Sequence, residues 1–347
     1  MFYALLLLSA VSVVVVYSAS AESMDTLVRH LVRLAMGFGL MIFVAQFRPE
    51  TFARWTPWIF FGGLVLLGAV FAVGDISKGA QRWLDLGIVR FQPSEVMKLA
   101  VPMMLAWYFS RQPLPPKLIH VAVGGIIILI PSVLIAEQPD LGTAGLTFMA
   151  GAAVLFVAGM SWRIIIVLGA SALAAIPVLW TYMHDYQRQR VLTLLNPEAD
   201  PLGTGYHTIQ AMIAVGSGGV FGKGWLNSTQ AHLDFLPEAT TDFIFAVYAE
   251  EFGLIGIVLL LGLYLFILLR GMMIAFYAQE TFNRLLAAGV TLVFFFYFFI
   301  NMGMVTGILP VVGVPLPLMS YGGTSMITLM TALGMLMSIQ THRGLIR

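Results

Sequence analysis

The chain has 347 residues, of which 59% are hydrophobic and only 10% are charged, and its mean hydropathy is +0.91. Water-soluble domains carry roughly 25% charged residues, so this chain cannot cover a water-facing surface. The formal net charge of +1 provides no basic field for nucleic acid, and the lack of cysteine excludes disulfides and thiol chemistry. The composition predicts a single membrane domain over residues 1–347.

In chain order, the sequence contains ten apolar segments, and a helix needs about 20 such residues to cross a bilayer. They cover residues 2–18, 28–46, 57–73, 94–110, 118–136, 143–160, 164–183, 243–269, 285–305 and 318–341. Backbone groups in lipid must bond within their own segment, which favours helices. The predicted fold class is therefore an all-α polytopic membrane protein with about ten transmembrane helices.

The first segment has an alternative interpretation. Ala19, Ser20 and Ala21 resemble a signal-peptidase site, but the positively charged region that precedes the apolar core of a signal peptide is missing. We therefore expect the first helix to be retained. Cleavage would leave the other nine segments oriented as before.

The charges of the short loops predict the orientation, because cytoplasmic loops are enriched in Lys and Arg. With a cytoplasmic N-terminus, the acids of the inner loops are Glu50 and Glu280 alone. The bases of the same loops are Arg48, Arg54, Arg111, Lys117, Arg163, Arg270, Arg284, Arg343 and Arg347. We expect both termini to be cytoplasmic.

The longest outer segment, residues 184–242, lies between the seventh and eighth helices. Loops beyond about 15 residues are usually functional or disordered, and the apolar residues Ile209, Met212, Val220 and Trp225 argue against disorder. Two further outer loops, 74–93 and 306–317, are rich in Gly, Pro and polar residues. A large structured extracytoplasmic loop is expected.

Two polar positions lie at the outer ends of helices. Glu95 and Lys98 are three residues apart, hence on one helix face. Lys within a span is costly and faces a bundle interior or watery cavity, so the two form either a structural pair or a cavity lining. Asp140, in the turn before the sixth helix, either caps that helix or pairs with Lys98.

Residues 236–242 lead directly into the eighth helix. Asp242 immediately before it is a good N-cap, worth about 1 kcal/mol, or a carboxylate at the outer rim that acts as a general base. The preceding run from Gly216 to Gly224 lacks the spacing of a nucleotide-binding loop. It is either a turn or a close backbone approach to a ligand phosphate. The six histidines show no metal-ligand spacing, so no metal site is assigned.

Several strings, in order and at similar spacing, make the chain resemble the shape, elongation, division and sporulation family. They are Ser77–Gly87, Arg90–Glu95, Gln138–Thr143, Ser217–Gly224, Leu236–Ala246, Glu250–Gly253, Asn301–Gly303, Leu309–Pro317 and Ser320–Gly323. The Val311–Pro315 version looks more like the elongation branch than the division branch. Thr240 departs from the pattern, since relatives usually carry His there, so no mechanism should depend on that His.

The resemblance implies a ten-helix peptidoglycan glycosyltransferase that polymerises lipid II on the outer face of the bacterial cytoplasmic membrane. Asp242 would be the catalytic carboxylate and would deprotonate the acceptor 4-hydroxyl, and the displacement of undecaprenyl pyrophosphate would proceed with inversion. The cavity or substrate-binding residues would be Glu95, Lys98, Asp140, Lys78, Arg82, Arg90, Glu238 and Lys223. No cofactor is evident, although a divalent cation (Mg²⁺ or Mn²⁺) is compatible with this chemistry. The family also implies a class B penicillin-binding protein as a transpeptidase partner.

Two other functions compete with the polymerase. A lipid II flippase would suit the paired charges within helices, but we find no internal repeat of the kind typical of transporters. A non-catalytic scaffold would need Asp242 only as a cap, and Asn caps comparably. The structured outer loop favours the enzyme.

Overall fold

The computed structural model describes residues 1–77, 80–85, 90–183, 185–199, 205–233, 235–236 and 238–342. Within these residues, each of the ten predicted apolar segments overlaps one long helix. The helices are α1 (Phe2–Ala19), α2 (Met24–Ala45), α3 (Pro49–Val73), α4 (Pro93–Phe109), α5 (Leu118–Glu137), α6 (Leu141–Val157), α7 (Trp162–Tyr182), α11 (Ile244–Phe276), α12 (Thr281–Val305) and α13 (Thr324–Thr341). The predicted all-α polytopic fold is confirmed.

Among the described residues, six helices have both the length and the hydropathy of a membrane span: α1, α2, α3, α5, α11 and α12. Helices α6 and α7 are shorter apolar helices. Helices α4 and α13 are less apolar, and neighbouring helices surround them: α4 packs against α3, α6 and α12, and α13 against α2. Because protein rather than lipid contacts most of α4, that helix tolerates charged residues.

Three helix boundaries differ from the predicted ones by six residues or more. Helix α3 begins at Pro49 rather than at 57, and Pro suits the first turn because its missing N–H has no helical partner there. Helix α11 continues to Phe276 instead of ending at 269. Helix α13 begins at Thr324 rather than at 318, because the chain turns through residues 318–323 before it.

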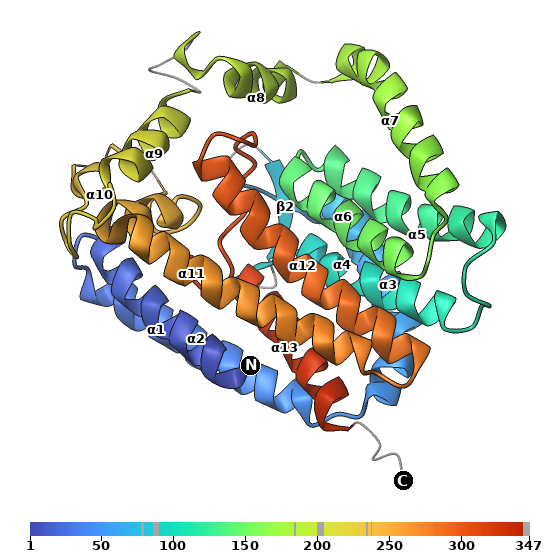
Figure 1. The fold of residues 1–347 in the computed structure, drawn as a ribbon. Coiled ribbons are helices and arrows are strands. Elements are labelled where there is room, and N and C mark those ends of the chain that lie inside the picture. Colours follow the sequence, from blue (N-terminus) through green and yellow to red (C-terminus); the bar gives the residue numbers. More distant parts are fainter. Residues whose placement is uncertain are drawn as a thin grey trace.

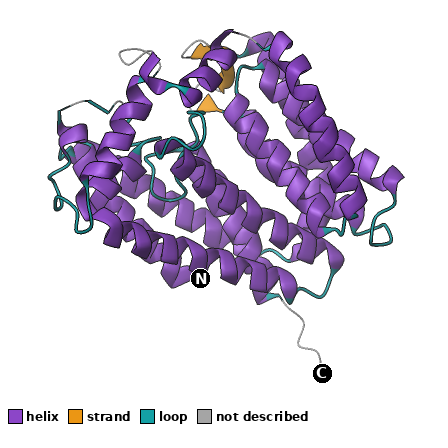
Figure 2. Ribbon diagram, turned by 45° about the horizontal axis from the view of Figure 1, so that its top comes forward, coloured by secondary structure: helices purple, strands orange, loops and turns teal. Residues whose placement is uncertain are grey.

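Two of the three outer regions predicted as loops contain regular structure. Residues 75–91 include three short antiparallel strands, β1 (Asp75–Ser77), β2 (Ala80–Asp85) and β3 (Arg90–Phe91), which the sequence analysis missed. The segment 184–242 contains α8 (Asp185–Leu195), a 3₁₀ turn (Pro197–Ala199), α9 (Tyr206–Ser217) and α10 (Thr229–His232), so the prediction of a structured loop is confirmed. Figures 1 and 2 show the strands and α8 at one end of the bundle, and both termini lie at the other.

Helix α7 stands apart from the bundle (Figure 1) and makes few contacts with other helices. Its large apolar side chains are exposed along its length, including Trp162, Ile166, Leu173 and Ile176. A helix this apolar on several sides is covered by lipid in a membrane.

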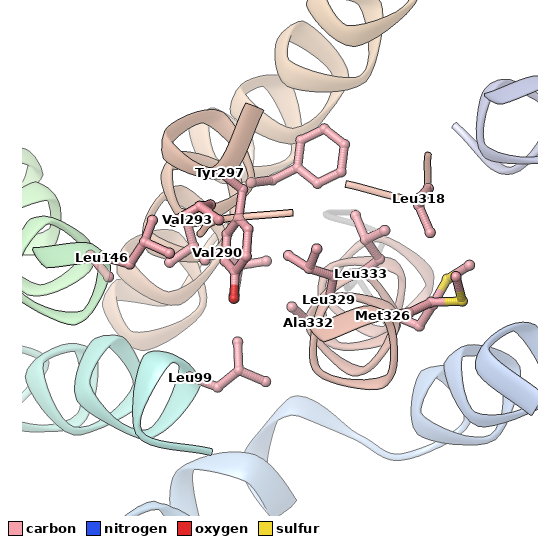
Figure 3. Close-up of a cluster of buried hydrophobic side chains, with 14 of the residues drawn as sticks. Leu99, Leu146, Val290, Val293, Tyr297, Leu318, Met326, Leu329, Ala332 and Leu333 are labelled. Carbon is pink, nitrogen blue, oxygen red and sulfur yellow. The ribbon is translucent and has the colours of Figure 1, made fainter. Parts of the chain in front are cut away.

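The core fills the space between α4, α6, α12 and α13. Leu99, Leu146, Val293 and Leu333, one from each helix, converge around Tyr297 of α12 (Figure 3). Tyr297 and its apolar neighbours are fully or almost fully buried. This packing fixes the positions of the polar residues that lie one or two turns closer to the strand-bearing end.

Helix α11 is broken at Gly253, whose φ of 62° is unfavourable for residues with a Cβ. The chain from 219 to 224 completes the hydrogen bonding at the break. Lys223 and Gly224 donate N–H groups to the carbonyls of residues 250 and 251, at 3.0 Å each. Gly219 and Val220 accept from the N–H groups of residues 254 and 255, at 2.9 and 3.2 Å.

Helix α1 packs beside the break in α11 and contacts the residues around it. The Ser18 hydroxyl donates to the buried carboxylate of Glu251, and the Trp225 indole donates to the Val14 carbonyl at 3.1 Å. Helix α1 also packs against α2 and α11. These contacts join α1 to α11 and to the segment before it, and the retention of the first helix stays a prediction.

Candidate active site

A cavity of about 390 Å³ brings together five of the residues that the sequence singled out: Arg82, Glu95, Lys98, Asp140 and Asp242. The cavity lies at the strand-bearing end of the bundle, because β2 and α8 contribute to its walls. Helices α4, α6, α12 and α13 and the segment Val312–Pro315 form most of the rest.

Glu95 and Lys98 form the predicted pair on one face of α4. The Lys98 Nζ lies 2.7 Å from Glu95 Oε1, and Lys98 is only 2% exposed. The ammonium also lies 4.8 Å from the centre of the Tyr297 ring, where the negative face of the ring attracts it. Glu95 Oε2 and the Tyr297 hydroxyl, both buried, have no hydrogen-bond partner in the described part of the chain.

Asp140 is the N-cap of α6, as one of its two predicted roles required. Its carboxylate accepts from the Thr143 N–H at 3.1 Å and from the Gln92 side-chain amide at 3.1 Å. Arg82 approaches the same carboxylate to 4.0 Å and donates to the Pro139 carbonyl at 2.5 Å. The alternative pairing with Lys98 is wrong, because Lys98 pairs with Glu95 in the described structure.

Asp242 is not the cap of α11. The helix begins at Ile244, its N-cap residue is Phe243, and no side chain makes a cap hydrogen bond there. The Asn301 side-chain amide instead holds the Asp242 backbone, donating to its carbonyl at 2.8 Å and to the Val314 carbonyl at 2.7 Å. A Cβ added to Gly313 would lie 3.4 Å from Asp242 Oδ2, so this glycine borders the carboxylate.

The two residues before Asp242 are also held by hydrogen bonds, which come from Ser320 and Tyr321. The Ser320 hydroxyl donates to the Thr241 carbonyl at 2.5 Å, and the Tyr321 N–H donates to the Thr240 carbonyl at 2.8 Å. Hydrogen bonds to three consecutive backbone carbonyls, those of Thr240, Thr241 and Asp242, hold the backbone that carries the Asp242 side chain.

The remaining predicted site residues lie elsewhere or outside the described structure. Glu238 is exposed in the turn before Asp242, where it accepts a hydrogen bond from the Thr241 hydroxyl at 2.9 Å. Lys223 is outside the cavity and pairs with buried Glu250 of α11 at 2.6 Å. Lys78 falls outside the described residues, and of Arg90 only the backbone, in β3, is described.

The glycine-rich run before Lys223 makes its close approach to protein rather than to a phosphate. A Cβ on Gly222 would lie 2.1 Å from the Glu251 carbonyl oxygen, so only glycine fits there. The glycine-rich run therefore completes the backbone hydrogen bonding at the break in α11.

The lining residues that were not anticipated include Gln92, Arg190 and Tyr297. Arg190 lies on α8, within the long outer segment. Its only signal in the sequence was its positive charge in that segment. Gln92 and Tyr297 carry no distinguishing pattern, since a lone polar residue at a helix end and an aromatic in an apolar helix are common.

An apolar groove of about 280 Å³ adjoins the cavity. The two share Gln92, Glu95 and Thr324 as lining residues. The apolar walls come from α3, α4 and α13 and include Ile59, Val96, Leu99, Met103, Ile327 and Met335. A ligand with a polar head and an apolar tail would find a matching surface for each part.

No group of three or more His, Asp or Glu side chains that could hold a metal ion occurs in the described ranges. A divalent cation would therefore take one or two of the cavity carboxylates and complete its shell with substrate phosphate, as Mg²⁺ commonly does.

The fold and the cavity define a multi-pass helical membrane protein whose carboxylates and cations meet at one end of the bundle. A family profile described as "Cell cycle protein" (FtsW/RodA/SpoVE) matches residues 1–345. Peptidoglycan glycosyltransferase MrdB of Escherichia coli K12 is 53% identical over 99% of this chain and 93% of its own. Peptidoglycan glycosyltransferase RodA of Treponema pallidum is 32% identical over 98% and 96%.

Solved structures agree with these sequence relatives. A chain of a peptidoglycan synthase complex superimposes with a TM-score of 0.86 at 31% identity, covering 99% of this chain and 97% of its own. The rod shape determining protein RodA of Thermus thermophilus gives 0.74 at 28% identity, covering 99% and 96%. The chain belongs to the FtsW/RodA/SpoVE family and is a membrane peptidoglycan glycosyltransferase of cell wall synthesis.

Proposed function

We propose that this protein polymerises lipid II into glycan strands on the outer face of the bacterial cytoplasmic membrane during cell elongation. The observation that carries the proposal is one cavity that holds Asp242 together with the cations of Arg82, Lys98 and Arg190. The substrate chemistry needs a base, compensation for a pyrophosphate and room for sugars, and this cavity offers all three.

Asp242 is the proposed general base. Its carboxylate takes the proton from the 4-hydroxyl of the acceptor sugar, and that oxygen bonds to the anomeric carbon of the donor chain. The bond between this carbon and the pyrophosphate oxygen breaks in the same displacement, so the anomeric configuration inverts. Undecaprenyl pyrophosphate leaves with the bonding pair, and fixed cations stabilise the charge that develops on it.

The apolar groove supports a lipid-linked substrate. It adjoins the cavity beside Glu95 and runs between the helices α3, α4 and α13. An isoprenoid chain lying there keeps its pyrophosphate next to Lys98 and Arg82. Burial of the chain contributes about 25 cal/mol per Å² of apolar surface removed from water, although a chain arriving from lipid gains less.

The loop charges orient the cavity away from the cytoplasm. Placing the Arg-rich end of the bundle inside puts both termini in the cytoplasm and Asp242 outside, where lipid-linked precursor is consumed. We infer a class B penicillin-binding protein as the transpeptidase partner, which would crosslink the strands made here. The likeness to a chain of a peptidoglycan synthase complex supports that partner.

The deciding experiment measures lipid II polymerisation by purified protein with its transpeptidase partner, comparing wild type with Asp242→Asn. We expect polymer from wild type and none from the folded variant, because Asn keeps the size of the side chain and loses the proton acceptor. Glu280→Gln, an exposed carboxylate change at the other end of the bundle, is the matched control and should polymerise normally.

Each other outcome has a distinct meaning. Equal polymer from wild type and Asp242→Asn would leave the enzyme standing and remove Asp242 as its base. No polymer from wild type, together with transfer of labelled lipid II across vesicle membranes, would replace the polymerase with a flippase.

A further inference from the structure

Arg33 is a cation inside a membrane span that has no anionic partner among the described residues. It lies on α2, about 14 Å from Met24 at 1.5 Å per residue, near the middle of the helix. Its guanidinium carbon lies 4.1 Å from the centre of the Tyr321 ring. In the part of the chain that the structure describes, Arg33 makes no hydrogen bond and no ion pair.

The contrast with Arg29, one turn away on the same helix, is informative. Arg29 pairs with Asp25 at 2.6 Å, and both side chains are mostly exposed at the outer end of α2. Arg33 lies deeper, is only partly exposed, and has an aromatic face in place of a carboxylate. A ring compensates part of the charge but accepts none of the five guanidinium N–H groups.

The surroundings of Tyr321 hold a second unsatisfied group. His30, also on α2, is buried, and its ring lies 6.0 Å from that of Tyr321. Its Nε2 lies 2.7 Å from the Ser12 hydroxyl, which itself donates to the Met319 carbonyl, so Nε2 is the donor. His30 Nδ1 is then a buried acceptor with no partner among the described residues. No acid among the described residues balances Arg33 here, and a charged group inside a span marks a functional site.

Tyr321 contacts both Arg33 and the segment that leads to Asp242. Its N–H donates to the Thr240 carbonyl at 2.8 Å, two residues before Asp242. Arg33 therefore lies next to Tyr321 and Gly323 but does not line the Asp242 cavity, whose own cations are Arg82, Lys98 and Arg190. The protein thus presents cations at two positions, one beside Asp242 and one set back from it.

The proposed polymerisation needs two such positions, because two lipid-linked pyrophosphates are present at once. In the donor, the reacting carbon is bonded directly to the pyrophosphate, so the donor's cations must lie beside Asp242. In the acceptor, a disaccharide separates the attacking hydroxyl from the pyrophosphate, so its cation must be set back. We propose that Arg33, held against Tyr321, binds the pyrophosphate of the acceptor lipid II; the assignment rests on the proposed function.

The test separates the two substrates. A labelled, lipid-linked glycan oligomer serves as donor and lipid II as acceptor, and single additions are followed while each is titrated in turn. For Arg33→Gln we expect the acceptor KM to rise about tenfold or more, as for loss of a charge-assisted contact, with the donor KM and kcat unchanged. Arg29→Gln is the matched control and should change neither KM.

A second variant covers the case in which Arg33→Gln does not fold. Arg33→Lys keeps a cation over the ring but loses the planar fork that pairs with phosphate oxygens. It should raise the acceptor KM by less than Arg33→Gln and leave the thermal unfolding temperature near that of wild type. A purely structural role would lower the unfolding temperature and affect donor and acceptor alike, which overturns the proposal.

The membrane's own phospholipids are the competing source of phosphate. The titrations are therefore repeated in nanodiscs of phosphatidylcholine alone and with phosphatidylglycerol added. An acceptor effect in both membranes supports the proposal, whereas an effect only with phosphatidylglycerol assigns Arg33 to ordinary anionic lipid and overturns it. Wild type that adds no sugar at all refutes the polymerase itself, while normal addition by both Arg33 variants refutes only the acceptor site.

Discussion

Replacing Lys98 with Met should destabilise the protein through the carboxylate that is left behind. Glu95 is 8% exposed, and Lys98, at 2.7 Å, is its one ion-pair partner among the described residues. Removing one partner of a buried pair costs about 3–5 kcal/mol, because the other charge stays buried. Since Glu95 lines a cavity that water can enter, we expect the lower end, about 3 kcal/mol.

The double variant Glu95→Gln, Lys98→Met tests the cause of that loss. With both charges gone, no ion remains buried, and replacing a whole buried pair is often nearly neutral. The free energy of unfolding should therefore return to within about 1 kcal/mol of wild type, apart from the lost contact of Lys98 with Tyr297. Thermal unfolding of the purified proteins in one detergent compares the stabilities of wild type, Lys98→Met and the double variant.

Measuring the turnover of the stable double variant distinguishes a role of Lys98 in stability from a role in the reaction. If Lys98 stabilises the leaving pyrophosphate, the stable double variant should lose about 10²–10³-fold in kcat, as when other preorganised charge-stabilising groups are removed. The reasoning is refuted if Lys98→Met unfolds at the wild-type temperature, or if the double variant is no more stable than the single one. A stable double variant with normal turnover would remove Lys98 from the chemistry alone.

Three further changes test the support of Asp242 and α11. Asn301→Ala removes the donor to the Asp242 and Val314 carbonyls, so kcat should fall about tenfold while the KM for lipid II changes little, as steady-state kinetics would show. Gly313→Ala adds a Cβ beside Asp242 at a φ of +75°, which costs about 1–2 kcal/mol, and should lower kcat and the unfolding temperature together; unchanged kcat would contradict the contact. Lys223→Met leaves Glu250 buried with only neutral donors, so thermal unfolding should report a loss of about 2–3 kcal/mol, whereas Lys223→Arg should retain most stability.

The helices were predictable because long apolar runs have few alternatives in lipid. Their ends were less predictable, since the turn before α13 begins with apolar Leu318 and Met319 and thus extends the apolar run of the helix that follows. The strands between α3 and α4 were missed for a related reason. β1 and β3 are only three and two residues long, and their pairing with β2 is a contact between segments rather than a local pattern.

The candidate site was partly predictable. The spacing of Glu95 and Lys98 and the capping position of Asp140 are local signals, and the structure contains both interactions. Lys223 was misplaced because its partner, Glu250, is 27 residues away in the chain and beyond any helical spacing. Arg190 joins the cavity only because α8 folds over the bundle end, which no local pattern records.

The break at Gly253 has a consequence for how the protein enters the membrane. Residues 219–224 precede α11 in the chain, so in the proposed orientation we expect them to reach the outer face before α11 is fully inserted. The N–H groups of residues 254 and 255 can then bond to Gly219 and Val220 instead of facing lipid unpaired. The outer segment thus acts as a template for the helix that follows it during biosynthesis. A short insertion between 219 and 224 should reduce the amount of inserted protein, and not merely its turnover.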